Sequence, residues 1–226
     1  MSTATLEAPQ IQAPEVAAQT IAPHEVEVPD ISFTPEELPR KRLISADDFM
    51  RMAEAGWFAE QRVELINGDI IIMPPISEDH AQSLTDTSEK LYEPLIGKLK
   101  IRIQQPFFAG DNGRPEPDIA VVRPESLNPK QPPSEALLLI EISRTTLQYD
   151  RTTKLSLYAS LGISDYWIVN LIENQVEVHR QPIESASAQF GHNYASRQIY
   201  QRGQSISLLE VPEVSIDVDA MLPQFA

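Results

Sequence analysis

The segment 135–143, EALLLIEIS, constrains the fold more than any other part of this sequence. Its near-continuous apolar run is typical of a strand buried on both faces of a sheet, which needs cover on each side. A second run of this kind, DYWIVN, occupies 165–170, and helical spacing over about 150–161 lies between the two. This order predicts an α/β (α+β) domain with a central mixed β-sheet flanked by helices.

Weaker signals complete the predicted order of elements. Asn67-Gly68 between two apolar runs is the strongest short hairpin signal, since a type I′ turn needs positive φ at both central positions. It predicts paired strands over 62–66 and 69–73. Periodicity further predicts a helix from Ser45 to Gly56, a helix over 78–99, several more strands, and additional C-terminal β-strands in the last 40 residues.

The first 39 residues contain six prolines and no periodic apolar pattern. We therefore expect a disordered Pro/Glu-rich N-terminal arm over 1–39, followed by a single domain over 40–226. The arm is interpreted either as a solvating tail or as a docking segment for a protein partner. The chain start lacks the basic and apolar regions of a signal peptide, and no apolar run approaches the ~20 residues of a membrane helix. A cytoplasmic protein without a membrane partner is expected.

Composition removes several classes of site. The absence of cysteine excludes disulfides, thiol catalysis and cysteine-ligated metals. No phosphate-loop, dinucleotide or nucleophile-elbow motif is present, and the four histidines are too scattered to predict a zinc pair. The net charge of −15 opposes nucleic-acid binding at long range. Seven of the 33 acids lie in residues 1–40, however, so a local basic groove is compatible with the total.

Three acids stand where a carboxylate is costly. Glu141 lies inside the buried run and, by alternation, shares a face with Leu139 and Ser143. Asp118 opens the strand DIAVV, and Glu64 lies in the first hairpin strand. Acids at matching heights on neighbouring strands can form an oxygen-rich site for a hard cation such as Mg²⁺. For Asp118 a capping role, and for Glu64 a surface ion pair, remain open alternatives.

Other polar residues are expected near these acids. Lys154, on the helix of 150–161, is expected at the edge of its packed face; it could place a cation near the acids or pair with Asp150 one turn earlier. His80 faces inward at the start of its helix, as a core histidine or a site residue. Near the strand–helix junction, three more side chains could contact phosphate or be solvated: Arg144, Tyr149 and Arg151.

Three runs together resemble the Uma family of restriction-endonuclease domains, within the PD-(D/E)XK nuclease superfamily: RVELINGDIIIMPPISEDH, RPEPDIAVV and LLLIEISRTTLQYDRTTKLSLYASLGISDYWIVN. The similarity covers about residues 43–181. The family pattern has an acid in the hairpin strand, a Pro-Asp at a strand start, a Glu in the next apolar strand and a Lys on the following helix. This chain matches those positions with Glu64, Pro117-Asp118, Glu141 and Lys154. The superfamily name expects lysine two residues after the Glu, where this chain has Ser143.

The resemblance implies a restriction-endonuclease-like fold and hydrolysis of DNA phosphodiester bonds with Mg²⁺ or Mn²⁺. Asp118, Glu141 and the backbone carbonyl of Ile142 would bind the metal. Lys154 would position or activate the attacking water, and Glu64 would support the site or a second metal. A homodimer is expected, because cutting both strands of DNA needs two sites.

Four residues are candidate accessory groups of such a site: His80, Ser143, Tyr149 and Arg151. Two other functions remain open. The acidic charge, the Pro-rich arm and Ser143 favour a non-catalytic interaction or regulatory module on the same fold. A metal-dependent phosphoesterase with a non-DNA substrate would use the same acids.

Overall fold

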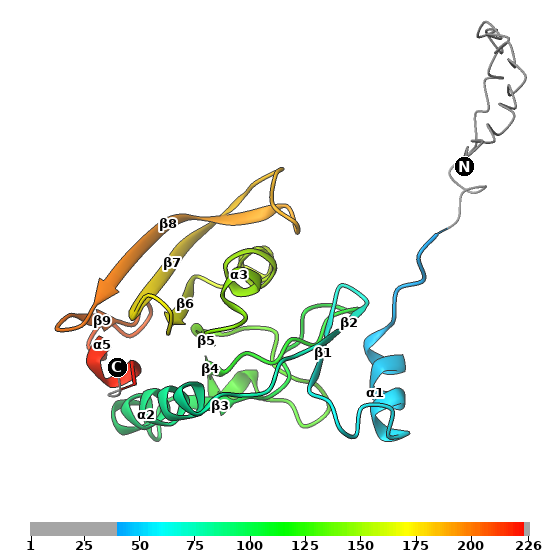
Figure 1. Cartoon of the computed structure of the whole chain (residues 1–226), viewed down its shortest axis with the longest axis horizontal. Coiled ribbons are helices and arrows are strands. Elements are labelled where there is room, and N and C mark those ends of the chain that lie inside the picture. The colour runs from blue at the N-terminus through cyan, green and yellow to red at the C-terminus, as the bar shows by residue number, and fades with distance from the viewer. Residues whose placement is uncertain (1–39, 224–226) are drawn as a thin grey trace, which may run out of the picture. The chain divides into compact units, whose positions relative to one another are not determined.

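A six-stranded mixed sheet forms the centre of the fold (Figure 1). The computed structural model describes residues 40–223, so the arm predicted over 1–39 and its partner lie outside the described residues. The strands of the sheet, in spatial order, are β3 (Lys100–Ile103), β4 (Ile119–Val122), β5 (Leu138–Ser143), β6 (Asp165–Asn170), β7 (Gln175–Glu184) and β8 (His192–Gln201).

The two buried runs form the middle of this sheet, as their composition predicts. β5 and β6 are parallel neighbours, with Ile140 opposite Trp167, and every other pair in the sheet is antiparallel. All twelve residues of these two strands are buried. The mixed sheet predicted from the sequence is therefore confirmed.

Strand alternation divides β5 between two hydrophobic clusters. Leu138 and Ile140 belong to a cluster that includes Leu91 and Leu95 of α2 (Glu78–Leu95), whereas Leu139 belongs to one that includes Tyr158. Figure 1 accordingly shows α2 on one side of the sheet and the helical region labelled α3 on the other. Glu141 thus lies on the face of Leu139, as alternation predicts.

The helical segment after β5 is less regular than its sequence predicts. It begins at α3 (Leu147–Tyr149), continues as a five-residue π-helical turn (Asp150–Lys154, hereafter the π turn) and ends in α4 (Leu155–Ser160). The segment lies against the Tyr158 side of the sheet, whereas the short C-terminal elements cover the α2 side. These elements are β9 (Ser205–Ser207), β10 (Ser215–Asp217) and α5 (Val218–Met221).

A separate hairpin precedes the sheet. β1 (Val63–Ile66) and β2 (Asp69–Ile72) pair through Asn67-Gly68, whose φ values of 49° and 78° confirm the predicted turn. α1 (Ala46–Glu54) packs on this hairpin through a small cluster that includes Phe49 and Leu65. A short 3₁₀ turn (Pro124–Ser126) completes the elements. Within residues 40–223, no helix has both the length and the apolar character needed to span a bilayer.

The close approach of Gly68 to the segment before α1 predicts a large effect of one added methyl group. A Cβ at Gly68 would lie 2.5 Å from the Cβ of Leu43, whereas a Cβ at Gly97, where φ is also positive, would meet nothing within 4 Å. Gly97→Ala should therefore lower the free energy of unfolding by about 1–2 kcal/mol through backbone strain alone. Gly68→Ala should lower it by a further 1–3 kcal/mol, roughly the effect of overpacking. Urea unfolding of the two variants tests this, and equal losses would contradict it.

Candidate active site

The register of β4 and β5 brings Asp118 and Glu141 together. Ile119 pairs with Ile140, so the residue before β4 lies opposite the residue after Ile140. The Asp118 backbone N–H lies 3.4 Å from Glu141 Oε2, and the Ile142 N–H donates to Asp118 Oδ2 at 2.8 Å. Asp118 and Glu141 are both buried, and each is 5% exposed. The predicted acids therefore form one buried pair on neighbouring strands.

Lys154 lies between the acid of β5 and the acid of the hairpin. Its Nζ donates to Glu141 Oε1 at 2.9 Å and to Glu64 Oε1 at 3.0 Å. Tyr158 donates its hydroxyl to the same Glu141 oxygen at 2.7 Å. The expectation that Lys154 lies at the edge of a packed face is wrong, because the whole residue is buried. Neither Asp150 nor a surface arginine is the partner: Lys154 and Glu64 bind each other.

Hydrogen bonds hold the hairpin against the rest of this site. Leu65 and Arg114 exchange backbone hydrogen bonds of 3.3 and 2.7 Å in an isolated bridge. This bridge ties β1 to the loop that leads into β4, four residues before Asp118. Glu64, the residue before Leu65, is thereby held where its side chain reaches Lys154.

Asp118 is held in its charged form by three donors. His80 Nε2 and Gln104 Nε2 each lie 3.1 Å from Oδ1, and the Ile142 N–H contacts Oδ2. Burial alone would raise the pKa of Asp118, but the hydrogen bonds and the neighbouring His80 outweigh burial and lower it. His80, for which a core role and a site role were both open, contacts the predicted metal ligand directly.

The charges around Lys154 do not balance. Burial acts to lower the pKa of Lys154, but Glu141 and Glu64 outweigh it and raise that pKa well above its ordinary value. Burial opposes ionisation of Glu141 and raises its pKa, while Lys154 acts in the opposite direction. Glu64 Oε2 is buried without a hydrogen-bond partner among residues 40–223. One ammonium group therefore faces two carboxyl groups, with Asp118 adding a further negative charge.

Asp150, at the start of the π turn, is a fourth buried acid of the site. It accepts hydrogen bonds from Ser143 Oγ at 2.6 Å and from Thr146 Oγ1 at 2.7 Å. Ser143, two residues after Glu141, thus connects β5 to the π turn. Sequence reasoning treated Asp150 only as a partner for Lys154. The i, i+4 spacing that places both residues on one helix face was the available signal.

A pocket opens onto these acids. It is lined by the four buried acids and also by Glu116, which sequence reasoning missed. Burial and the neighbouring Glu64 raise the pKa of Glu116. Two arginines, Arg62 and Arg144, line the same pocket, as do Ile142 and His80. The sequence signal for Glu116 was its position in Pro-Glu-Pro-Asp, two residues before Asp118.

The remaining residues predicted near the strand–helix junction have different positions. Arg144, which lines the pocket, pairs with Asp79. Tyr149 has a buried hydroxyl without a hydrogen-bond partner among the described residues and does not line this pocket. Arg151 does not line the pocket; its side chain is partly exposed and pairs with Glu173 and Glu177.

The acids leave room for a hard cation but do not form a closed cage. In the described part of the chain, no three His, Cys, Asp or Glu side chains are arranged to hold a metal by themselves. Mg²⁺ commonly binds through one or two carboxylates, with water and substrate phosphate completing its octahedron. Asp118 and Glu141 fit this donor set, and the unpaired Glu64 oxygen adds negative charge nearby.

Comparison with known proteins identifies the family. A family model named Uma2 and described as "putative restriction endonuclease" matches residues 46–219. This chain belongs to the Uma2 family. No curated protein matches the chain. Among solved structures, a "putative nuclease belonging to DUF820" from Anabaena variabilis is similar, with a TM-score of 0.58 and 15% identity. The match covers 79% of this chain and 97% of that chain, and at this identity it concerns the fold.

The lysine of this Uma2 domain is predicted to stabilise its fold. Lys154→Met leaves Glu64 and Glu141 buried without their shared cation, so the free energy of unfolding near neutral pH should fall by about 3–5 kcal/mol. Adding Glu64→Gln removes one unpaired charge and should restore part of this loss. Urea unfolding of both variants tests the ion pairs; a double variant less stable than Lys154→Met would contradict them.

The raised pKa of Asp150 predicts that the stability of the Uma2 domain depends on pH. Burial is the main cause that raises its pKa from 3.8 to about 6. Because the folded pKa is above the unfolded pKa, protonation of Asp150 stabilises the fold at low pH, and this contribution is lost between about pH 4 and pH 6. At about 1.4 kcal/mol per tenfold change in proton affinity, the loss is at most about 3 kcal/mol.

Asp150→Asn removes this titration and keeps a carbonyl oxygen that can accept from Ser143 and Thr146. Its stability relative to the wild type should therefore rise by about 1–3 kcal/mol as the pH increases through this window. Urea unfolding at a series of pH values measures the difference between the two proteins. A difference that does not change with pH would show that Asp150 is not a buried titrating group.

Proposed function

We propose that this domain is an endonuclease that hydrolyses DNA phosphodiester bonds with Mg²⁺ or Mn²⁺. The observation that supports this most is the excess of buried carboxyl groups around Lys154, in a pocket that also contains two arginines. Buried acids without matching cations are unfavourable, and a divalent cation with a phosphate group would offset the excess. Family membership agrees with the proposal.

Asp118 and Glu141, with the Ile142 carbonyl, would hold the cation. Ile142 lines the pocket, and its N–H donates a hydrogen bond that orients Asp118. Strand β5 therefore carries Glu141 and also fixes the side chain of Asp118. A bound Mg²⁺ or Mn²⁺ would supply a water of lowered pKa and neutralise charge on the phosphate. The hydrogen bonds from His80 and Gln104 keep Asp118 charged and oriented for this task.

Lys154 would act as a fixed cation in this reaction. Its two carboxyl partners raise its pKa, so the amine stays protonated and is not a general base at neutral pH. A protonated Lys154 can stabilise negative charge that develops on the phosphate or orient the attacking water. Arg62 and Arg144, on the pocket wall, would contact the phosphates on either side of the bond that is cut.

Calorimetry with Mn²⁺ and a DNA cleavage assay test this function together. Asp118→Asn and Glu141→Gln should each weaken Mn²⁺ binding at least about tenfold and slow cleavage at least about 100-fold. Asp86→Asn is the control, because Asp86 accepts a hydrogen bond from Gln82 on α2 and does not line the pocket. Circular dichroism establishes that each variant is folded.

The assay should include supercoiled, linear and single-stranded DNA, and a small phosphodiester. Cleavage of the small ester alone would support the phosphoesterase alternative. A folded wild type that binds no Mn²⁺, with or without DNA, and cleaves none of these substrates would overturn the proposal in favour of an interaction module.

A further inference from the structure

The lysine of the site is carried by an uncommon piece of helix. The Leu155 N–H bonds to the carbonyl of Asp150, five residues earlier, which is the hydrogen bond of a π-helix. Isolated π turns are rare and are found frequently at functional sites. A local conformation of this kind persists when contacts from the surrounding structure hold it. The neighbours of the π turn therefore determine where Lys154 is placed.

Arg151 attaches the π turn to β7 through a forked ion pair. Its Nε donates to Glu177 Oε1 at 2.9 Å and Oε2 at 3.2 Å, and its Nη2 also contacts Glu177 Oε1. The same Nη2 lies 3.2 Å from both carboxylate oxygens of Glu173. The preceding carbonyl, that of Asp150, accepts from the Tyr166 hydroxyl at 3.1 Å. Two successive residues of the π turn are thus fixed to β6 and β7.

Glu177 is a rigid anchor for this contact. Its side chain is completely buried on β7 and also accepts from Asn170 Nδ2 at 2.9 Å and Arg197 Nη2 at 2.9 Å. Burial acts to raise the pKa of Glu177, but its hydrogen bonds and cationic neighbours outweigh it and lower that pKa. The carboxylate therefore stays charged, and a charge-assisted fork from an arginine is a strong and directional contact.

The hairpin formed by β7 and β8 also holds the helical segment just after Lys154. Ser156 donates to the His192 carbonyl at 2.8 Å and accepts from the Phe190 N–H at 2.9 Å. Thr153, on the π turn, donates to Gln189 Oε1 at 2.9 Å. Lys154 thus lies between two points at which its helix is attached to the same hairpin.

We propose that Arg151 is a positioning residue: its fork to Glu177 holds the π turn so that Lys154 reaches Glu64 and Glu141. The importance of this placement for catalysis rests on the proposed function, but the placement itself does not. Without the fork the π turn loses its attachment to Glu177, and the Lys154 ammonium leaves its buried position more often. Arg151 itself touches none of the reacting groups.

Acetylation of lysines with N-hydroxysuccinimidyl acetate, followed by peptide mass spectrometry, measures this placement. The chain has six lysines, and Lys154 is the buried one; the other five are exposed and serve as internal standards: Lys41, Lys90, Lys98, Lys100 and Lys130. In the wild type, Lys154 should react far more slowly than these five. In Arg151→Ala, Lys154 should react at least about tenfold faster than in the wild type, as expected for a local opening, while the five standards stay unchanged.

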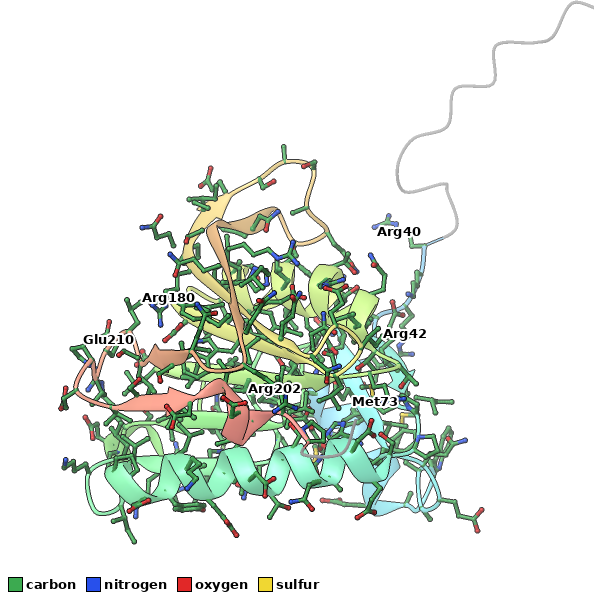
Figure 2. All side chains as sticks on the ribbon, turned by 60° about the vertical axis from the view of Figure 1, so that its left-hand side comes forward. Arg40, Arg42, Met73, Arg180, Arg202 and Glu210 are labelled. Carbon is green, nitrogen blue, oxygen red and sulfur yellow. The ribbon has the colours of Figure 1, made fainter. Side chains whose placement is uncertain are left out.

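Arg180→Ala is a matched control. Arg180 forks onto buried Asp165 as Arg151 does onto Glu177, and the exposed fractions of the two arginine side chains are 20% and 25%. It lies on β7, does not contact the π turn, and lies apart from Met73 of the pocket in Figure 2. Arg180→Ala should therefore lose a similar ion pair and leave Lys154 protected. Urea unfolding measures the free energy of unfolding of both variants, so that their labelling rates can be compared at known stability.

Two results would overturn the proposal. One is a folded Arg151→Ala in which Lys154 is labelled at the wild-type rate. The other is equal acceleration in Arg180→Ala at equal stability, which would make the effect one of global destabilisation. If Arg151→Ala does not fold, Arg151→Lys replaces it, because lysine keeps the charge without the fork. Lys154 should then be labelled faster than in the wild type, by a smaller factor than expected for Arg151→Ala. An unchanged labelling rate in Arg151→Lys would also overturn the proposal.

The labelling needs no substrate, so it separates this inference from the proposed function. A wild type without nuclease activity would contradict the proposed function. The labelling experiment would still test whether Arg151 holds Lys154 in place. If the wild type cleaves DNA, Arg151→Ala should lower kcat while Mn²⁺ binding stays unchanged, because Asp118 and Glu141 remain in place. A loss of Mn²⁺ binding instead would contradict a role confined to Lys154.

Discussion

An ammonium group and two carboxyl groups meet in the interior of the fold, and they come from three parts of the chain. Lys154 is on the helical segment, Glu141 on β5 and Glu64 on the hairpin. None of the three could be buried alone without a large loss of stability. The hairpin, which belongs to a different sheet, is therefore bound to the central sheet by the same contacts that assemble the site. The ion pairs of Lys154 therefore contribute both to the stability of the fold and to the placement of Glu64 and Glu141.

Under the proposed function, the same cluster would explain how an acidic chain can bind a phosphate. One lysine does not balance Glu64 and Glu141, and Asp118, Asp150 and Glu116 open onto the same pocket. A chain with a net charge of −15 repels a polyanion at long range, so binding has to be favoured locally. A cation held by the acids, with Arg62 and Arg144 beside it, would reverse the sign of the potential where a phosphate enters. Under the proposed function, the acids would oppose DNA binding without the metal and favour it with the metal.

Local pattern was sufficient to predict the sheet and the identity of the central acids. Alternation in β5 places Glu141 on the face of Leu139, and Asn67-Gly68 forms the expected turn, because both follow from neighbouring residues. The burial of Lys154 was not predicted, because a regular helix was assumed where the chain forms a π turn. The partner of Arg151 was also missed. Glu177 is 26 residues further along the chain, and no periodicity connects a helix to the second strand after it.

Ser143 shows why the lysine of this domain depends on distant contacts. A lysine on β5, two residues after Glu141, would be placed by the strand itself, whose backbone at this position pairs with Asn170 of β6. In this chain that position is Ser143, and its hydroxyl instead donates to Asp150 at the start of the π turn. The strand therefore positions the turn, and the turn positions the lysine. A lysine carried by a helix is placed less directly than one on a strand, so the helix needs attachment to rigid elements. The fork from Arg151 to Glu177 provides it at the residue next to Asp150, and the β7–β8 hairpin thereby contributes to the site without lining its pocket.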